Sequence, residues 1–254
     1  MLKNGLINYW ENLYLLNKKV GHRNDIFRNV EDAFVLKFGN FIGSDNCLDI
    51  GSGESIIPVL LNTEYGCNVK AIDINIDSLK TQEKYKLLLN SSISLEEQDA
   101  TKLSYPDNFF DKIVAISAIE HFPNDGDSRS IKEFFRVLKH KGKCLITVPF
   151  GNYEENDKTW YYNGFERRYD LENLTRRIID ASDMKVNKLL FLSPPNCNFI
   201  NEIYNKIGNI FELYYRGNYH ITHDELSFGL TLGWIELTEN PNSSFGALLC
   251  LEKD

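Results

Sequence analysis

The chain has 254 residues, of which 43% are hydrophobic and 25% are charged, so it can form a substantial core and is not globally disordered. The formal net charge of −8 argues against the basic footprint of a nucleic-acid-binding protein. The N-terminus lacks an apolar targeting segment and no run approaches a membrane span, so we expect a cytoplasmic protein with neither nucleic acid nor membrane as partner.

Five widely spaced cysteines form no C-x-x-C pair, and three of them lie in apolar runs typical of strands. This pattern favours buried free thiols in a reducing compartment over metal ligands, and no metal site is predicted. The five residues are Cys47, Cys67, Cys144, Cys197 and Cys250.

Two apolar stripes at helical spacing, over residues 6–19 and 25–38, precede the first predicted strand. A polar break between them contains His22 and Arg23. Two interpretations stay open for these helices. They cap the sheet by packing alone, or they form a lid that places Arg23 or His22 near a ligand.

From residue 46 onward, short apolar runs alternate with helical patterns, which indicates a parallel sheet covered on both faces. We expect one domain, with a helical cap over 1–41, a core over 42–150, and a second half over 151–254 that contains an insertion at 193–244. Strands are predicted at 46–50, 67–72, 93–97, 109–117, 143–149, 185–192 and 245–251, and helices at 54–63, 77–89, 127–138 and 170–182.

The first strand ends in Asp49-Ile50-Gly51-Ser52-Gly53, a sharp turn into a helix. Glycines at this turn let the backbone approach a ligand, and the helix N-terminus offers N–H donors. The next two strands end in Asp73-Ile74 and lead to Asp99-Ala100. Because ligands bind beyond the carboxyl ends of such strands, these residues predict a pocket for an adenosine with a charged tail.

Two cofactor classes fit an adenosine pocket. A dinucleotide turn requires Gly-x-Gly-x-x-Gly, but Ile56 occupies the third glycine position here. Asp49 would face a pyrophosphate unfavourably, whereas it suits the ammonium group of a methionine moiety. The residues therefore favour S-adenosylmethionine over NAD.

Four motifs in order resemble those of class I S-adenosylmethionine-dependent methyltransferases of the broad type 11 group. The resemblance covers about residues 40–150 and implies a Rossmann-like, doubly wound, mostly parallel seven-stranded α/β sheet. One departure is Ser55, where the family often has a third small residue, glycine. The motifs are Leu48-Asp49-Ile50-Gly51-Ser52-Gly53, Ala71-Ile72-Asp73-Ile74-Asn75, the run from Asp99 to Ile113, and the run from Glu133 to Gly142.

The resemblance also implies a role for individual residues in binding S-adenosylmethionine and releasing S-adenosylhomocysteine. Asp49 and the turn Gly51-Ser52-Gly53 would hold the methionine part, and Asp73 the ribose. Ile74, Asp99 and Ala100 would contact the adenine, and Ser117 would lie under the sulfonium. The implied reaction is an in-line methyl transfer, in which positioning supplies much of the acceleration.

His121 is the best candidate for a catalytic base, because Ser117-Ala118-Ile119-Glu120-His121 follows the fourth strand, where the methyl group must point. The alternative is that Glu120 and His121 only shape the pocket. Weaker candidates for substrate contacts are Arg23, Glu120, Tyr162, Arg168 and Tyr169, and an exposed loop explains 160–169 equally well. The pair His220-x-x-His223 suggests a surface or lid more than a metal site.

The sequence lacks the Asn/Asp-Pro-Pro-Tyr/Phe motif of base-directed methyltransferases after strand four, which favours a small-molecule acceptor. We expect an O-methyltransferase acting on a sugar, phosphorylated or nucleotide-linked metabolite, in bacterial surface-polysaccharide (capsule) modification. The alternatives are a non-catalytic S-adenosylmethionine-binding partner subunit, an N- or C-methyltransferase, and an NAD-dependent oxidoreductase. The sequence does not choose between a monomer and a homodimer.

Overall fold

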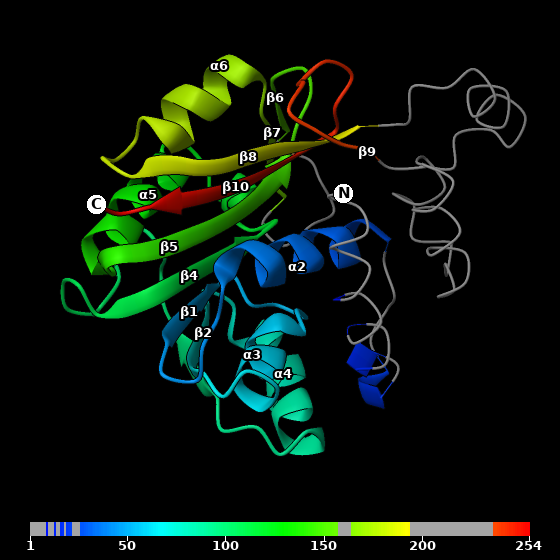
Figure 1. Cartoon of the computed structure of the whole chain (residues 1–254), viewed down its shortest axis with the longest axis vertical. Coiled ribbons are helices and arrows are strands. Elements are labelled where there is room, and N and C mark those ends of the chain that lie inside the picture. Colours follow the sequence, from blue (N-terminus) through cyan, green and yellow to red (C-terminus); the bar gives the residue numbers. More distant parts are fainter. Residues whose placement is uncertain are drawn as a thin grey trace, which may run out of the picture.

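One mixed β-sheet dominates the computed structural model, which describes residues 9, 13, 16–17, 19–21, 26–156, 164–193 and 236–254. Its strands lie in the order β3-β2-β1-β4-β5-β10-β8-β9 (Figure 1). The bounds are β1 Asn46–Ile50, β2 Asn68–Asp73, β3 Ser94–Glu97, β4 Phe110–Ile116, β5 Leu138–Pro149, β8 Lys185–Ser193, β9 Glu236–Thr238 and β10 Gly246–Glu252.

The pairing confirms the predicted doubly wound, mostly parallel sheet. β1 pairs in parallel with both β2 and β4, and β4 pairs in parallel with β5. β10 enters between β5 and β8 and is antiparallel to both. All seven predicted strands are present, and the short β9 adds an eighth at the edge beside β8. A separate ribbon pairs β6 (Glu154–Asn156) with β7 (Glu166–Arg168).

Helices cover both faces of the sheet. The first cluster of buried side chains joins α2 and α3 to one face, and the second joins α5 and α6 to the other. Alternation along the strands explains this division, because Cys47 belongs to the first cluster and Leu48 to the second. The bounds are α2 Ile26–Gly39, α3 Ile57–Thr63, α4 Ile76–Leu88, the 3₁₀ turn η1 Ile119–His121, α5 Gly126–Val137, and α6 Leu171–Leu174, which continues as the π-helical turn η2 Thr175–Ile179.

Local sequence explains several of the boundaries. Pro58 lies in the first turn of α3, where a missing N–H is tolerated. Asn75 caps α4, because its side chain accepts a hydrogen bond from the Asp77 N–H. Asp170 caps α6 as predicted, and its carboxylate accepts from the Asn173 N–H at 2.8 Å. Four of the predicted free thiols are buried, and Cys197 lies outside the described residues.

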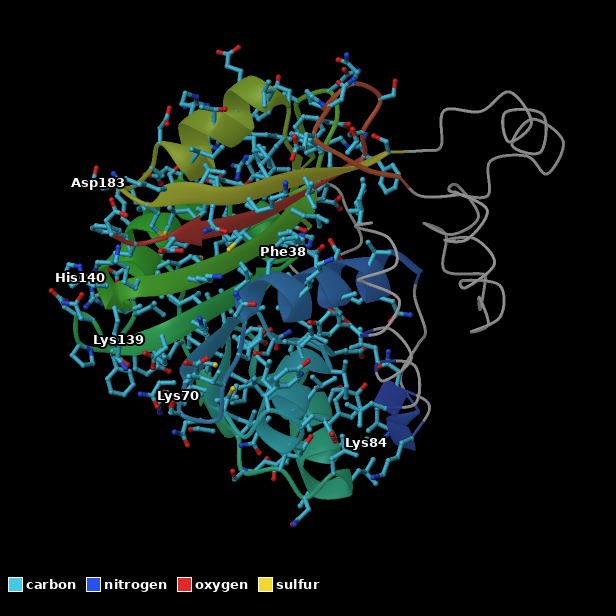
Figure 2. All side chains as sticks on the ribbon, viewed as in Figure 1. Phe38, Lys70, Lys84, Lys139, His140 and Asp183 are labelled. Atoms are coloured by element: carbon cyan, nitrogen blue, oxygen red, sulfur yellow. The ribbon has the colours of Figure 1, made fainter. Side chains whose placement is uncertain are left out.

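Helix α2 lies in the segment predicted to form a helical cap, and it crosses the sheet. Its C-terminal end is fixed where the Lys143 ammonium donates to the Phe38 carbonyl at 3.0 Å. Its first turns lie over the carboxyl ends of the strands, at the edge opposite Lys139 and His140 (Figure 2). In the preceding segment, residues 9, 13, 16–17 and 19–20 are helical, and Leu13 and Val20 are buried.

The sequence also predicts a lid over the ligand, built from the N-terminal helices together with residues 151–165 and 193–244. Most of the latter two segments falls outside the described residues, so the lid stays a prediction. Within the described part of the chain, every helix is too short or too polar to traverse a bilayer.

Candidate functional site

The turn after β1 brings bare backbone to the carboxyl edge of the sheet. Gly51 and Gly53 have backbone φ values of +62° and +44°, which residues other than glycine rarely adopt. A Cβ on Gly51 would lie 2.8 Å from the Cβ of Ala118, in the segment that leaves β4. The turn is held to β2, because the Ser52 N–H donates to the Ile72 carbonyl at 3.0 Å.

Gln82 of α4 stabilises this turn from behind. Its fully buried amide nitrogen donates to the carbonyls of Ser52, Gly53 and Ser55, at 3.2, 3.2 and 2.6 Å. Sequence reasoning missed Gln82, although a glutamine on the buried face of the helix after β2 is a signal for such a role. The glycine turn is thus preorganised by a side chain that lies about 30 residues away.

Asp49, directly before the turn, is buried and only partly satisfied. It is 3% exposed, and its Oδ2 atom has no hydrogen-bond partner among the described residues. Burial raises the pKa of Asp49 to about 7; Asp73 adds repulsion, while the Ser52 hydroxyl and Arg28 act in the opposite direction. A buried carboxylate oxygen without a partner is costly, so the site suits a cationic ligand group here.

The predicted ribose and adenine contacts lie at the ends of β2 and β3. Asp73 is 7% exposed, and its two oxygens accept from the Gly53 N–H at 3.1 Å and the Asn75 N–H at 2.8 Å. Burial raises its pKa. Ile74 is 68% exposed and offers an apolar surface. Asp99 lies at the surface, and Ala100 beside it is buried.

Helix α2 contributes two charged residues that sequence reasoning missed. The Arg28 guanidinium donates to the Ile116 carbonyl at the end of β4, at 3.2 Å, and pairs with Glu31 at 3.2 Å. Glu31 accepts a hydrogen bond of 2.9 Å from the Ser117 hydroxyl. Ser117 itself has a φ of +44°, and its N–H donates to the side chain and carbonyl of Thr147. The cap helix therefore reaches the predicted cofactor residue Ser117.

Glu120 and His121 form the 3₁₀ turn directly after this point. The His121 Nδ1 atom lies 3.0 Å from the Phe165 carbonyl, which can only accept, so Nδ1 carries the hydrogen. The Nε2 atom then holds the lone pair of a neutral imidazole, and it lies 3.9 Å from Glu120 Oε1. Glu120 is 1% exposed. Burial, with repulsion from Glu31 and Glu166, raises its pKa well above the usual value.

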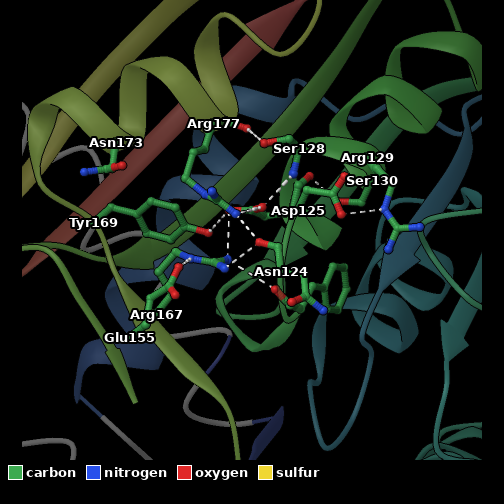
Figure 3. A network of polar contacts seen from close by, with 12 residues as sticks. Asn124, Asp125, Ser128, Arg129, Ser130, Glu155, Arg167, Tyr169, Asn173 and Arg177 are labelled. Carbon is green, nitrogen blue, oxygen red and sulfur yellow. Dashed lines mark hydrogen bonds and ion pairs between the residues drawn. The ribbon is translucent and has the colours of Figure 1, made fainter. Parts of the chain in front are cut away.

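A buried ion cluster fixes the segment that follows His121 (Figure 3). Asp127, at the start of α5, accepts from Arg167 at 2.9 Å and from Arg177 at 2.8 and 2.7 Å. Arg167, which is fully buried, also donates to the carbonyls of Phe122 and Asn124 at 3.2 and 2.9 Å. Glu155 accepts from the Arg167 Nε–H group at 2.9 Å. The charge of Arg167 is therefore compensated by protein groups.

The weaker substrate candidates separate in the structure. Tyr169 is fully buried, and its hydroxyl donates to Asp127 at 2.9 Å, so it belongs to the ion cluster. Arg168 is exposed and lies 4.0 Å from Glu154 of the neighbouring strand. Arg23 and Tyr162, like the pair His220 and His223, lie outside the described residues.

Comparison with known proteins agrees with this arrangement. Residues 48–146, which contain the glycine turn and the ends of β1 to β5, match the family model of the methyltransferase domain. These residues form a methyltransferase domain of the class I S-adenosylmethionine-dependent type. The cofactor of this methyltransferase family is S-adenosylmethionine. The Asp49 Oδ2 atom, which has no partner among the described residues, the glycine turn and Asp73 fit its methionine and ribose parts.

Named relatives are similar to parts of the chain. Phosphoethanolamine N-methyltransferase 2 of Caenorhabditis elegans is 30% identical over 151 residues, 59% of this chain and 34% of the relative. Ajmaline N-methyltransferase of Rauvolfia serpentina is 29% identical over 133 residues, 50% of this chain and 44% of the relative. The chain thus spans less than half the length of these two relatives.

A solved structure shows the same fold as the methyltransferase described here. Coclaurine N-methyltransferase bound to N-methylheliamine and S-adenosylhomocysteine superimposes with a TM-score of 0.61. The comparison covers 89% of this chain and 72% of that one at 14% identity, so the likeness is one of fold.

The ion cluster yields a stability prediction. Asp127→Asn leaves the buried Arg167 and Arg177 without their shared carboxylate, so we expect a loss of about 3–5 kcal/mol in the free energy of unfolding. Urea denaturation measures it. The matched control is Asp125→Asn, whose carboxylate is 69% exposed and pairs with Arg129, with an expected change below about 1 kcal/mol. Equal effects of the two substitutions would contradict the assigned role.

The glycine turn yields a binding prediction. Gly51→Ala places a methyl group against Ala118 in a left-handed backbone conformation, so the turn must shift. We expect the affinity for S-adenosylhomocysteine, measured by calorimetry, to fall at least about tenfold. Gly43→Ala is the control, because a Cβ there meets the carbonyl oxygens of Tyr65 and Gly66 at 3.4 and 3.8 Å, which are ordinary contact distances. Unchanged affinity in Gly51→Ala would show that the ligand binds elsewhere.

Proposed function

We propose that the chain catalyses S-adenosylmethionine-dependent methyl transfer to a small-molecule acceptor. The observation that carries the proposal is the buried carboxylate of Asp49, whose Oδ2 atom has no hydrogen-bond partner among the described residues, beside the bare backbone of Gly51 and Gly53. When bound, the cofactor supplies a methyl group on a positively charged sulfur. Asp49 would hold its ammonium group, Asp73 its ribose, and Ile74, Asp99 and Ala100 its adenine.

The residues after β4 would then orient and deprotonate the acceptor. Phe165 fixes the hydrogen of His121 on Nδ1, which leaves Nε2 able to take a proton. The ion cluster holds the carbonyls of Phe122 and Asn124, so the loop that follows His121 is anchored. Positioning of this kind supplies much of the acceleration in a transfer from an activated donor.

Oxygen and nitrogen are candidates for the acceptor atom that receives the methyl group. Oxygen of a sugar, phosphorylated or nucleotide-linked metabolite, and a capsule role, stay predictions from the sequence alone. Arg167 does not support a phosphorylated acceptor, because its guanidinium is buried against Asp127 and Glu155. The names of the two relatives described above favour nitrogen.

Calorimetry with S-adenosylhomocysteine and with NAD separates the enzyme class from the oxidoreductase alternative. We expect binding of S-adenosylhomocysteine and none of NAD. Detection of released S-adenosylhomocysteine during incubation with S-adenosylmethionine and candidate acceptors then separates a catalyst from a non-catalytic partner subunit. A chain that binds NAD, or that fails to bind S-adenosylhomocysteine, is not this methyltransferase.

The raised pKa of Asp49 predicts how this binding depends on pH. The carboxyl has a pKa of about 7 in the free protein, and burial also raises that of Asp73. The amino group of S-adenosylhomocysteine stays protonated below pH 7 and requires an ionised Asp49. Below pH 7 binding must therefore release a proton, so the association constant should rise up to about tenfold per pH unit from pH 5 and level off above 7.

Asp49→Asn should bind at least about tenfold more weakly at pH 7 and show a flatter pH profile, because no carboxyl has to ionise at this position. Asp77→Asn is the control, since that carboxylate is 69% exposed on α4, and it should keep the wild-type profile. A wild-type association constant that stays level or falls from pH 5 to 7 would refute the role of Asp49.

A further inference from the structure

A second buried carboxylate, Glu120, has an oxygen that no contact of the described chain explains. The residue is 1% exposed, and its Oε2 atom has no hydrogen-bond partner among the described residues. Its other oxygen, Oε1, faces His121 Nε2 at 3.9 Å, which is beyond hydrogen-bond distance. Leaving a buried carboxyl oxygen without a donor costs free energy, so a ligand that donates a hydrogen bond there would offset that cost.

Glu120 differs from Asp49 in its place around the cofactor residues. Asp49 ends β1 beside the glycine turn, whereas Glu120 lies in the turn after β4, next to the candidate base His121. A sulfonium group has no N–H or O–H to donate, so the reactive centre of the cofactor cannot satisfy Oε2 by a hydrogen bond. The partner of Oε2 is therefore to be sought in the acceptor.

The charges around Glu120 select among acceptors. Glu31 of α2 and Glu166 of β7 act on Glu120 as like charges, and Arg28 acts as the opposing one. Arg28 is itself paired with Glu31. Two carboxylates from two other elements thus act on Glu120, against one guanidinium that is paired with Glu31. Such a site attracts a cation and repels a phosphate or carboxylate.

We propose, on the basis of the proposed methyl transfer, that the acceptor is an amine whose N–H group donates to Glu120 Oε2. A neutral hydroxyl gains nothing from the surrounding negative charge, whereas an ammonium group gains both a hydrogen bond and an ion pair. The buried carboxylate is then a specificity determinant for nitrogen over oxygen.

The proton balance of this step is simple. The acceptor enters as an ammonium ion and gives one proton to the Glu120 carboxylate. The freed nitrogen lone pair forms the N–C bond to the methyl carbon while the C–S bond breaks, and that electron pair stays on sulfur. The product leaves as an N-methylammonium ion, and Glu120 releases its proton to solvent, directly or through His121.

Matched pairs of amines and alcohols test this inference. Ethanolamine is compared with ethylene glycol, and 2-phenylethylamine with 2-phenylethanol, each incubated with S-adenosylmethionine, with methylated product detected by mass spectrometry. We expect methylation of amines and none of the paired alcohols. Calorimetry on protein saturated with S-adenosylhomocysteine provides a second readout, in which 2-phenylethylamine binds at least about tenfold more tightly than 2-phenylethanol.

Glu120→Gln keeps the size of the side chain and removes its charge. We expect amine methylation and 2-phenylethylamine binding to fall at least about tenfold, with the affinity for S-adenosylhomocysteine within about twofold of wild type. Because the substitution removes a buried charge, the melting temperature should not fall, which separates this role from a structural one. Glu172→Gln, exposed on α6, is the matched control and should leave all of these quantities unchanged.

Several outcomes would overturn the inference. Methylation of alcohols in preference to amines, no methylation of any amine by protein that binds S-adenosylhomocysteine, or full amine activity in Glu120→Gln would each reject it. A selective loss of S-adenosylhomocysteine binding in Glu120→Gln would assign Glu120 to the cofactor instead. If Glu120→Gln does not fold, Glu120→Asp replaces it, and an amine rate equal to wild type in that variant would also reject the proposal. Failure of wild-type protein to bind S-adenosylhomocysteine would instead reject the proposed function itself.

Discussion

The reversal of strand order between β1 and β4 is the constraint on which the site depends. β1 pairs with β2 on one side and β4 on the other, all in parallel, so their following segments leave the sheet at one edge. Helices to the two faces diverge from this point, and the space between them is available to a ligand. The contact between Gly51 and Ala118 marks how closely the two departing segments approach. Any side chain at residue 51 would push them apart.

Three buried acids of the described chain, Asp127, Asp49 and Glu120, illustrate two opposite arrangements. Asp127 is fully buried but receives hydrogen bonds from two arginines and a tyrosine, so its charge is compensated within the protein. Asp49 and Glu120 are equally buried, and each keeps one oxygen without a partner among the described residues. The first arrangement stabilises a fold, and the second raises pKa values and favours cationic ligands. Asp127 thus helps to anchor the loop after His121, whereas Asp49 and Glu120 give the proposed site its negative charge.

The sequence predicted the elements governed by local pattern. Apolar alternation located the seven strands, and the glycines with Asp49 located the turn, because strand period and turn chemistry are properties of adjacent residues. Contacts between distant residues were not accessible in this way. Glu31 and Ser117, which share a hydrogen bond, lie 86 residues apart in the sequence, and Arg167 and Asp127 lie 40 apart. The local pattern of a single sequence carries no signal for such pairs. Tyr169 illustrates the consequence, since its proximity to Arg168 suggested a substrate contact and its hydroxyl instead completes a buried cluster.

The ion cluster and the candidate base are joined through β7. Arg167 lies on this strand and holds the carbonyls of Phe122 and Asn124, while Phe165, directly before it, accepts from His121 Nδ1. The same short segment therefore fixes both the loop after His121 and the tautomer of its ring. The tautomer decides which ring nitrogen keeps a lone pair. Phe165, directly before β7, therefore sets Nε2 as the nitrogen that can accept a proton in the proposed reaction. Nε2 is left on the side of Glu120, so the carboxylate proposed to bind the acceptor amine and take its proton lies next to a ring nitrogen that can relay this proton.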